Sequence, residues 1–249
     1  MDFKGMTALV TGASNGIGAE TAARLGAGGA AVIVHYYSAA AEAERVLARV
    51  REAGGSGFAV QADLTTMAGT RAFIEQVRPH PVDILVNNAG SLIRRTGTLA
   101  MSEEIWEQTM MLNVTSAFFL TQAVLPGMLE RGRGYVVNVS SVAAKTGGGV
   151  GAGAYAAAKA ALSAWTKNLT KEFAAQGIRA NCVAPGTIDT NYHRQFSNEQ
   201  MLNAVRAATP LGRLGTSEEI ADLIVYLCTP GASFLHGQVI EINGGFLMA

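Results

Sequence analysis

Short runs of β-branched and other apolar residues alternate along this chain with segments long enough for helices. Runs such as Ile84-Leu85-Val86 are apolar on both faces, which suits a parallel sheet covered by helices on both sides. Alternation at this spacing is typical of βαβ units. The sequence therefore predicts an α/β fold with one doubly wound parallel sheet of about seven strands and helices on both faces. The expected strands are Thr7 to Thr11, Val32 to Tyr36, Phe58 to Gln61, Ile84 to Val86, Tyr135 to Val139, Arg179 to Val183 and Gln238 to Ile242.

Nothing along the chain divides it into separate units. The 249 residues contain no Pro/Ser linker, no charge run and no internal repeat, and the glycine-rich stretch 147–153 is too short for a linker. An α/β domain of this length can be a single domain. We expect one domain over residues 1–249.

The charge balance excludes several classes of partner. Nineteen basic residues match 19 acidic ones, so the net charge is zero and no basic field would attract nucleic acid or anionic lipid. Charged residues make up 15%, against about 25% in an average domain. A surface with so few charges predicts that part of it is covered by another copy of the chain.

The termini and cysteines indicate a reduced, cytoplasmic setting. No run of 18 apolar residues occurs, so no membrane span is expected, and the start around Asp2 and Lys4 has neither a signal-peptide nor a transit-peptide pattern. Cys182 and Cys228 lack the spacing of a metal site, so we expect two reduced core thiols and no bound metal.

A glycine-rich turn follows the first expected strand and opens a helix at Thr11 to Gly18. Gly12 can make the tight turn, Gly16 can let backbone amides approach a pyrophosphate, and Gly18 permits close packing of helix on strand. By itself such a triplet is weak evidence, because steric reasons also select glycine in turns. Its place between strand and helix favours a dinucleotide site.

Further motifs occur in a fixed order along the whole chain. Asn87-Asn88-Ala89-Gly90 follows the fourth expected strand, and Tyr155 precedes Lys159 by four residues. With the glycine turn, the chain resembles the short-chain dehydrogenase/reductase family, most of all its 3-oxoacyl-carrier-protein reductases and its sugar and polyol dehydrogenases. The resemblance implies a Rossmann-type fold and an NAD(P)(H)-dependent oxidoreductase that interconverts a carbonyl and a secondary alcohol. It continues through Asp63-Leu64, Asn113, Ser140-Ser141, Pro185-Gly186 and Asn243-Gly244-Gly245.

Tyr155 and Lys159 form a plausible proton-transfer pair. Residues four apart lie on one face of a helix, and the lysine charge would favour the phenolate of a tyrosine whose ordinary pKa is about 10. Tyr155 could then protonate a carbonyl oxygen, or take the hydroxyl proton in the oxidative direction. The resemblance implies that Lys159 also holds the nicotinamide ribose.

Two more catalytic residues follow from the resemblance. Ser141, rather than Ser140, would hydrogen-bond the substrate oxygen where charge develops. The spacing from Ser141 to Tyr155 is one residue longer than is usual in the family, which an insertion in 147–153 would absorb. Asn113 resembles the asparagine that kinks its helix and holds a water for proton relay to Lys159.

The resemblance also implies which residues contact the cofactor. Asn88 is expected to connect neighbouring strands rather than to touch the cofactor. The implied cofactor residues are Gly12, Ser14, Asn15, Gly16, Ile17, Gly18, Tyr36, Ser38, Asp63, Leu64, Asn87, Ala89, Gly90, Tyr155, Lys159, Pro185, Gly186, Ile188 and Thr190.

The end of the second strand bears on the choice of cofactor. Enzymes that select NAD place an acid there, whereas this chain has His35-Tyr36-Tyr37-Ser38. Asn15 adds no positive charge that would hold a 2′-phosphate. We therefore expect a modest preference for NADP(H) over NAD(H).

The substrate is a small carbonyl or alcohol whose identity the motifs leave open. Its pocket is expected to come from the segments 91–97, 146–153 and 187–208, the last of them a mobile lid. Arg94 and Arg95 could meet an anionic group, or could simply be solvated.

Function classes other than a ketoreductase remain as alternatives. They are a sugar, polyol or other small-alcohol dehydrogenase, a non-catalytic dinucleotide sensor and a structural module. Intact Ser141, Tyr155 and Lys159 argue against the last two.

Apolar flanks on two helices predict a homotetramer. Ala156, Ala160, Ala161 and Ala164 follow Tyr155, and Phe118, Phe119, Ala123 and Met128 lie on the preceding long helix. In relatives these helices pair with their copies, and the tail Phe246-Leu247-Met248 would form a second interface; a dimer that lacks the tail contact is the competing expectation.

Overall fold

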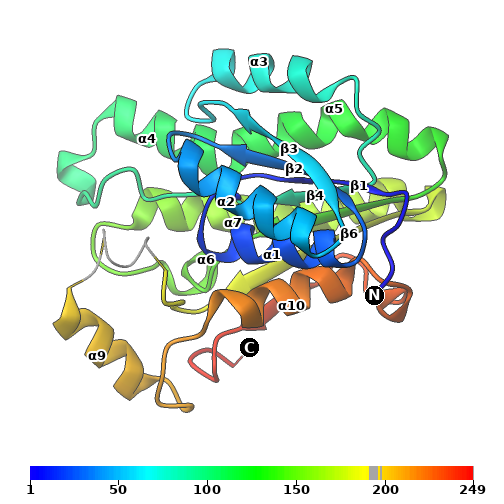
Figure 1. Ribbon diagram of the computed structural model, residues 1–249. Helices are drawn as coiled ribbons and strands as arrows, with labels where there is room; N and C mark the ends of the chain where they lie inside the picture. The colour runs from blue at the N-terminus through cyan, green and yellow to red at the C-terminus, as the bar shows by residue number, and fades with distance from the viewer. Residues whose placement is uncertain (191–195, 197, 249) are drawn as a thin grey trace.

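A parallel sheet of seven strands runs through the centre of the computed structural model, which describes residues 1–190, 196 and 198–248 (Figure 1). The strand order is β3-β2-β1-β4-β5-β6-β7, and every neighbouring pair is parallel. The predicted fold class is confirmed, and strand ends differ from the expected ones by one or two residues. The strands are β1 (Thr7–Val10), β2 (Ala31–Tyr36), β3 (Ser56–Gln61), β4 (Ile84–Asn87), β5 (Gly134–Val139), β6 (Ile178–Pro185) and β7 (Val239–Ile242).

Helices cover both faces of this sheet because successive strand side chains point to opposite sides. Ala8 and Val10 pack on one face under α1 (Gly16–Ala27), α2 (Ala40–Glu52) and α10 (Ser217–Leu227). Leu9, between them in sequence, packs on the other face. The helices there are α3 (Met67–Val77), α5 (Ser116–Glu130) and α7 (Gly153–Phe173). Both faces are thus buried, as the apolar strands predict.

Shorter elements connect these layers. The helix α4 (Glu103–Met110) continues through the wide π-helical turn η2 (Met111–Thr115) into α5. The short α6 (Ala143–Thr146) follows β5, and α9 (Glu199–Ala208) lies at the lower left of Figure 1, away from the sheet. Single 3₁₀ turns lie at η1 (Thr98–Ala100), η3 (Ala174–Gln176) and η4 (Pro230–Ala232). Cys182 and Cys228 are buried free thiols, as expected.

The continuous helix Glu103–Glu130 is long and apolar enough to cross a membrane by length and composition alone. In this fold one side of it packs on the sheet through Leu120, Leu125 and Met128. Only 39% of the most apolar 18-residue stretch of this helix is buried. Phe118 on this helix is 40% exposed in the single chain, as a contact between copies would require.

The strand order reverses between β1 and β4, and this reversal positions the site. Connections from β1 and β4 leave toward opposite faces of the sheet, so a crevice opens at the carboxyl ends of these strands. The glycine turn follows β1, Asn87 to Gly90 end β4, and Ser141 follows β5. The topology thus brings the sequence motifs to one edge of the sheet.

Candidate active site

A cavity of about 960 Å³ lies at the carboxyl edge of the sheet. Its wall contains most of the residues implied by the motifs. These are Gly12, Ser14, Asn15, Gly16, Ile17, Ser38, Asp63, Leu64, Ala89, Gly90, Ser141, Tyr155, Lys159, Pro185, Gly186, Ile188 and Thr190. Gly18, Tyr36, Asn87 and Asn113 are not part of that wall.

The glycine turn lies where a phosphate could be bound. Gly12 has φ +62°, and a side chain there would meet the Ala89 Cα at 3.0 Å. Asn15 caps α1 without a side-chain hydrogen bond, so the first N–H groups of the helix remain available at the cavity. An uncapped helix start behind a tight glycine turn fits a pyrophosphate. Gly18 instead packs against the Gly12 carbonyl and the Asn88 amide, as expected for helix packing.

His35 fixes this turn, a role that the sequence did not predict. Its Nδ1 accepts from the Gly12 N–H at 3.0 Å, and its Nε2 is 3.2 Å from the Ala62 carbonyl oxygen, to which it donates. Burial lowers the pKa of His35 to about 4, so the ring is neutral, as an Nδ1 acceptor must be. A polar residue ending a buried strand is the signal that could have indicated it.

One end of the cavity, where the resemblance implies that adenosine binds, lies beyond β2 and β3. Tyr37, Ser38 and Asp63 line it, and Asp63 accepts from the Thr65 N–H and hydroxyl at 2.8 and 2.6 Å. Tyr36 was expected to touch the cofactor, but its side chain packs on the core while Tyr37 faces the cavity. The reason is strand alternation, since adjacent side chains point to opposite sides.

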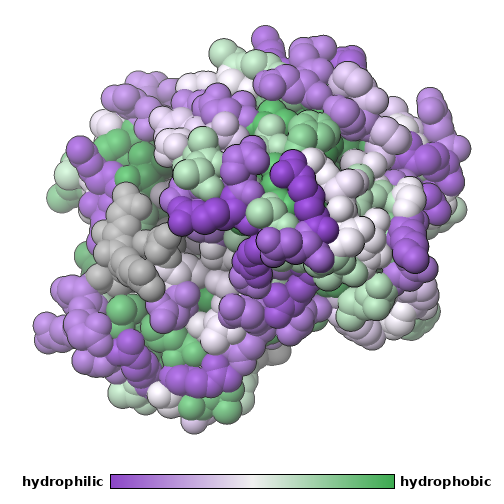
Figure 2. All heavy atoms as spheres, in the orientation of Figure 1, coloured by the Kyte–Doolittle hydropathy of each residue, from purple (hydrophilic) through white to green (hydrophobic). Residues whose placement is uncertain are grey.

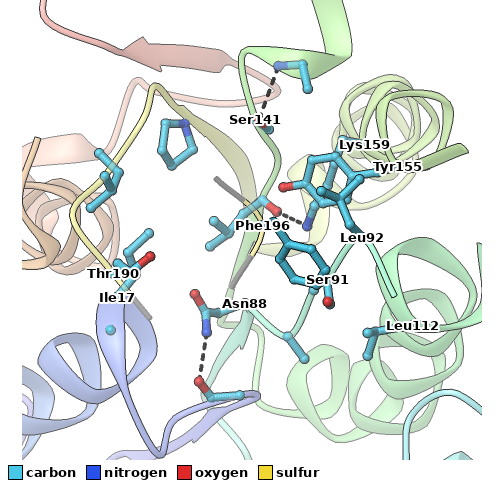
Figure 3. Close-up of a pocket in the computed structure, with 18 of the residues that line it drawn as sticks. Ile17, Asn88, Ser91, Leu92, Leu112, Ser141, Tyr155, Lys159, Thr190 and Phe196 are labelled. Carbon is cyan, nitrogen blue, oxygen red and sulfur yellow. Dashed lines mark hydrogen bonds between the residues drawn. The ribbon is translucent and has the colours of Figure 1, made fainter. Parts of the chain in front are cut away.

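Ser141, Tyr155 and Lys159 meet at the other end of the cavity (Figure 3). The Ser141 side chain lies close enough to Tyr155 to influence its pKa, and the Lys159 Nζ lies 5.6 Å from the Tyr155 ring centroid. Lys159 is buried and donates to the Val139 carbonyl oxygen at 2.7 Å, which leaves two ammonium protons for other acceptors. The two hydroxyl groups and the ammonium group therefore lie at the same end of the cavity.

The competition between the two serines is resolved by their hydrogen bonds. Ser140 is buried, and its Oγ donates to the Lys159 carbonyl oxygen at 2.9 Å. Ser141 Oγ accepts from the Ala143 N–H at 3.1 Å, which orients it while its own proton stays available. Ser141 is thus the serine suited to bind a substrate oxygen.

The pKa of Tyr155 differs in direction from the expectation. Burial raises it to about 12, against a small opposing effect of the Ser141 hydrogen bond, and burial lowers the pKa of Lys159 to about 8. Loss of hydration sets both directions, because burial disfavours the charged form of each group. At neutral pH the site holds a protonated phenol beside a protonated lysine, an arrangement suited to donating a proton.

Asn113 lies behind the cavity wall at the π-helical turn. Its Nδ2 donates to the Ser91 and Thr109 carbonyl oxygens at 2.7 and 2.8 Å, and its Oδ1 accepts from the Ser91 N–H at 3.1 Å. A side chain at Gly90 would lie 2.7 Å from this Oδ1 and 2.8 Å from Lys159 Nζ. Asn113 thus connects the widened helix to the segment after β4, next to Lys159.

The two asparagines at the end of β4 connect neighbouring elements. Asn87 donates to Thr121 Oγ1 at 3.1 Å and to Asn138 Oδ1 at 2.8 Å, so it is buried away from the cavity, contrary to the expectation of a cofactor contact. Asn88 donates to the Thr11 and Gly12 carbonyl oxygens, as expected, and also forms part of the wall.

The far wall comes from the chain after β6. Pro185, Gly186, Ile188 and Thr190 line the cavity, as do Phe196 and Val205 (Figure 3). The expected lid 187–208 includes 191–195 and 197, which lie outside the described residues. Phe246 also lines the cavity, although the sequence suggested only an interface role for it. No short-range pattern indicates a contact made by the chain end across the fold.

Known proteins share these features along the whole chain. Residues 12–247 match the family model described as "Enoyl-(Acyl carrier protein) reductase". The chain is 37% identical over 251 residues to a 3-oxoacyl-[acyl-carrier-protein] reductase FabG of Escherichia coli, with all of both proteins covered.

Two solved structures are similar in fold. One is a putative NAD(P)-dependent gluconate 5-dehydrogenase from Beutenbergia cavernae with bound NADP, at TM-score 0.93 and 32% identity, covering 100% of this chain and 99% of that one. The other is an NADH-dependent reductase responsible for alginate metabolism, at TM-score 0.89 and 33% identity, covering 99% and 98%. The full-length identity and the shared fold show that this chain belongs to the short-chain dehydrogenase/reductase family.

Proposed function

We propose that this protein is an NADP(H)-dependent ketoreductase that interconverts a carbonyl compound and a secondary alcohol, most like a 3-oxoacyl (carrier protein) reductase. The observation that carries the proposal is that Ser141, Tyr155 and buried Lys159 line the same cavity as the glycine turn, with Lys159 Nζ 5.6 Å from the Tyr155 ring centroid. A dinucleotide sensor would need no such group. The cofactor supplies the hydride when bound.

The side chains of this site would handle the proton. Ser141 would donate a hydrogen bond to the carbonyl oxygen and hold it beside the Tyr155 hydroxyl, where negative charge develops. Tyr155 would give its proton to that oxygen, and Lys159 would stabilise the phenolate left behind. Because the pKa of Lys159 is about 8, its ammonium can return a proton to a tyrosine whose pKa is about 12.

Residues at the adenosine end would hold the cofactor. Gly16 and Ile17 line the cavity at the start of α1, where their amides would bind the phosphates, and Lys159 would bind the ribose hydroxyls on the nicotinamide side. Asp63 and Leu64 would border the adenine. Asn113 would hold Ser91 in place through their two hydrogen bonds. We also propose that Asn113 holds a water that relays protons to Lys159.

NADP(H) is favoured over NAD(H). No carboxylate ends β2, where Tyr37 and Ser38 face the cavity, and the Beutenbergia cavernae relative was solved with NADP. Steady-state kinetics with both reduced cofactors tests this. A catalytic efficiency with NADH tenfold above that with NADPH would contradict it.

The substrate class has two candidates. The full-length similarity to a 3-oxoacyl-carrier-protein reductase favours a 3-oxoacyl thioester, whereas the similarity to a gluconate 5-dehydrogenase favours a sugar derivative. A screen that follows loss of reduced cofactor over ketoacyl thioesters, ketoses and keto sugar acids separates them.

Tyr155→Phe tests the reaction itself. The substitution removes the proton donor and should lower turnover by about 100-fold or more, while cofactor affinity stays within about twofold. If the variant keeps more than about a tenth of wild-type turnover, the Tyr155 hydroxyl stabilises the transition state by less than about 1.4 kcal/mol. The assignment of Tyr155 would then be wrong.

We also propose a single domain over 1–249, a cytoplasmic location and a homotetramer. Exposed Phe118 on α5 and exposed Ala161 and Ala164 on α7 support the contact between copies. Met128 and Ala156 are buried within the single chain, so they contribute nothing to that surface.

A further inference from the structure

The substrate end of the cavity holds an arginine whose charge no described carboxylate neutralises. Arg95 lines the cavity on the loop between β4 and α4, and its Nη1 donates to the Val150 carbonyl oxygen at 2.8 Å. Its Nε is buried without a hydrogen-bond partner. Across residues 1–190, 196 and 198–248, no ion pair includes Arg95. A buried donor left unpaired costs free energy, so an anion bound here would be stabilised.

The contacts of the guanidinium leave one nitrogen for a ligand. Nη1 donates to the Val150 carbonyl oxygen and Nε is buried, so Nη2 is the nitrogen that remains. A carboxylate oxygen that accepts from Nη2 would form a charge-assisted hydrogen bond, which is stronger than a neutral one.

A strained turn places Arg95 at the cavity. Ile93 is β-branched and has φ +57°, a conformation that such residues rarely adopt. The Arg94 N–H donates to the Leu92 carbonyl oxygen across this turn at 2.6 Å, and Ser91 Oγ accepts from the Ile93 N–H at 3.2 Å. After the turn Arg94 is exposed, whereas Arg95 is partly buried in the wall. Backbone strain of this kind typically costs about 1–3 kcal/mol and gathers at functional sites.

The glycine-rich segment 147–153 is fitted to the same side chain. A side chain at Gly151 would lie 2.9 Å from Arg95 Cγ, and one at Gly149 would lie 3.4 Å from its Nη1. The Thr96 N–H donates to the Gly151 carbonyl oxygen at 3.0 Å. Gly151 precedes Tyr155 by four residues, a separation of at most about 14 Å along the chain. Arg95 and Tyr155 thus line one cavity, and a short segment of chain connects the residue that contacts Arg95 to Tyr155.

The other charges of the cavity do not compensate Arg95. Among the described wall residues, Asp63 is the one acid, and it accepts from Thr65 at the end of β3. Four strand spacings separate β3 from β5, which carries Ser141, so about 19 Å lie between the two ends. The potential at the substrate end is therefore positive.

We propose that Arg95 binds a carboxylate of the substrate, so that the enzyme selects small ketones and alcohols that carry a carboxylate over neutral ones. This inference rests on the proposed ketoreductase function and, of its two substrate candidates, favours the keto sugar acid over the thioester. In the reductive direction the carbonyl carbon gains the hydride of NADPH, the oxygen gains a proton, and NADP⁺ is released; the carboxylate is unchanged.

Kinetics on matched pairs test the proposal. The probes are 5-keto-D-gluconate against D-fructose, and acetoacetate against methyl acetoacetate, each with NADPH. Arg95→Gln should lower kcat/KM for the two carboxylates by about 10- to 100-fold, mainly through KM, as expected for a lost charged hydrogen bond, and leave both neutral ketones within about twofold. Arg94→Gln is the matched control and should change neither. Equal losses on acid and neutral partner, or no preference for the acids in the wild type, would overturn the proposal.

A binding measurement separates this inference from the proposed function. If no ketone consumed NADPH, the ketoreductase function would fail, and titration calorimetry would decide the anion site. D-gluconate should bind to Tyr155→Phe protein in the presence of NADP⁺, D-glucitol should bind more weakly, and the added Arg95→Gln change should abolish the difference. Gluconate binding that is indifferent to Arg95 would overturn the site.

Discussion

At the scale of single residues, burial rather than charge sets the state of the catalytic groups. Tyr155 and Lys159 share a helix face, as their spacing predicts, but the pKa of the phenol rises to about 12 and that of the ammonium falls to about 8. Both groups lose hydration at the end of a cavity, and this loss disfavours each charged form. The proton stays on Tyr155, ready for transfer to a carbonyl oxygen.

The pH dependence of the reductive reaction follows from Lys159. Because its pKa is about 8 in the folded chain, the ammonium loses its proton as pH rises through that value, and turnover should fall with it. Lys159→Arg should move the fall to higher pH at reduced turnover, and Lys159→Ala should lose both turnover and cofactor binding. Profiles of kcat against pH for the wild type and Lys159→Arg measure this. Identical profiles would exclude Lys159 as the titrating group.

His35 makes stability depend on acid. Its folded pKa of about 4 lies below the ordinary 6.5, so between these values the unfolded chain binds a proton that the folded chain does not. The free energy of unfolding should therefore fall as pH drops from 6.5 to 4, by on the order of 3 kcal/mol.

Urea unfolding at several pH values measures this slope. His35→Asn should be less stable at pH 7 but should lose less on acidification than the wild type. His80→Gln is the matched control, because it removes a partly buried histidine that packs on Phe58 and makes no contact with the glycine turn. An unchanged slope in His35→Asn would assign the acid sensitivity elsewhere.

At the scale of elements, α9 differs from the helices that cover the sheet. None of its residues is buried, yet Val205 lines the cavity. Figure 2 shows hydrophobic residues among hydrophilic ones over this part of the surface, and Met201 is 39% exposed. A helix with few buried contacts can move at low cost in free energy.

Hydrogen exchange tests α9 as part of a lid. Amides of Glu199–Ala208 should exchange measurably more slowly when NADP⁺ is bound, because closure over the cofactor would bury Leu202 and Val205 further. Amides of α2 provide an internal control, since α2 lies on the covered face of the sheet. Equal exchange in α9 with and without cofactor would leave it a fixed surface helix.

At the scale of the whole molecule, the single chain has more exposed apolar surface than its two layers of helices explain. Phe118 is 40% exposed on α5, and only 39% of the most apolar 18-residue stretch of the helix Glu103–Glu130 is buried. Ala161 and Ala164 are exposed on the neighbouring α7. Small alanines allow helices from two copies to approach closely. These features favour a helical interface between copies.

Light scattering after size exclusion measures the assembly. Four copies of the 25.9 kDa chain give about 104 kDa, which is the expected mass at micromolar concentration. Ala161→Glu places a charge in the surface formed by Phe118 on α5 and Ala161 and Ala164 on α7, so the measured mass of the assembly should fall. A wild-type mass near that of two chains would contradict the interface formed by the C-terminal tail. A mass near that of one chain would show that the apolar sides of α5 and α7 face water.

The sequence by itself determined the fold class, the strand positions and most of the cavity wall. Apolar periodicity and glycine spacing act over a few residues, and parallel topology brings strand ends to one edge, so local pattern indicated Gly12. Ser141, Tyr155 and Lys159 were assigned by the resemblance to the family. Tertiary structure decided what depends on neighbours distant in sequence.

The orientation of side chains at the strand ends directs Tyr37 to the cavity and Tyr36 to the core. It also directs the Asn87 side chain to Asn138, away from the cavity. The pairing of His35 with Gly12 and of Arg95 with the segment 147–153 joins residues far apart along the chain. The direction of the Tyr155 pKa shift came from burial, which is a property of the assembled cavity. Hydration and long-range contact exist only after folding, and no local pattern in the sequence encodes them.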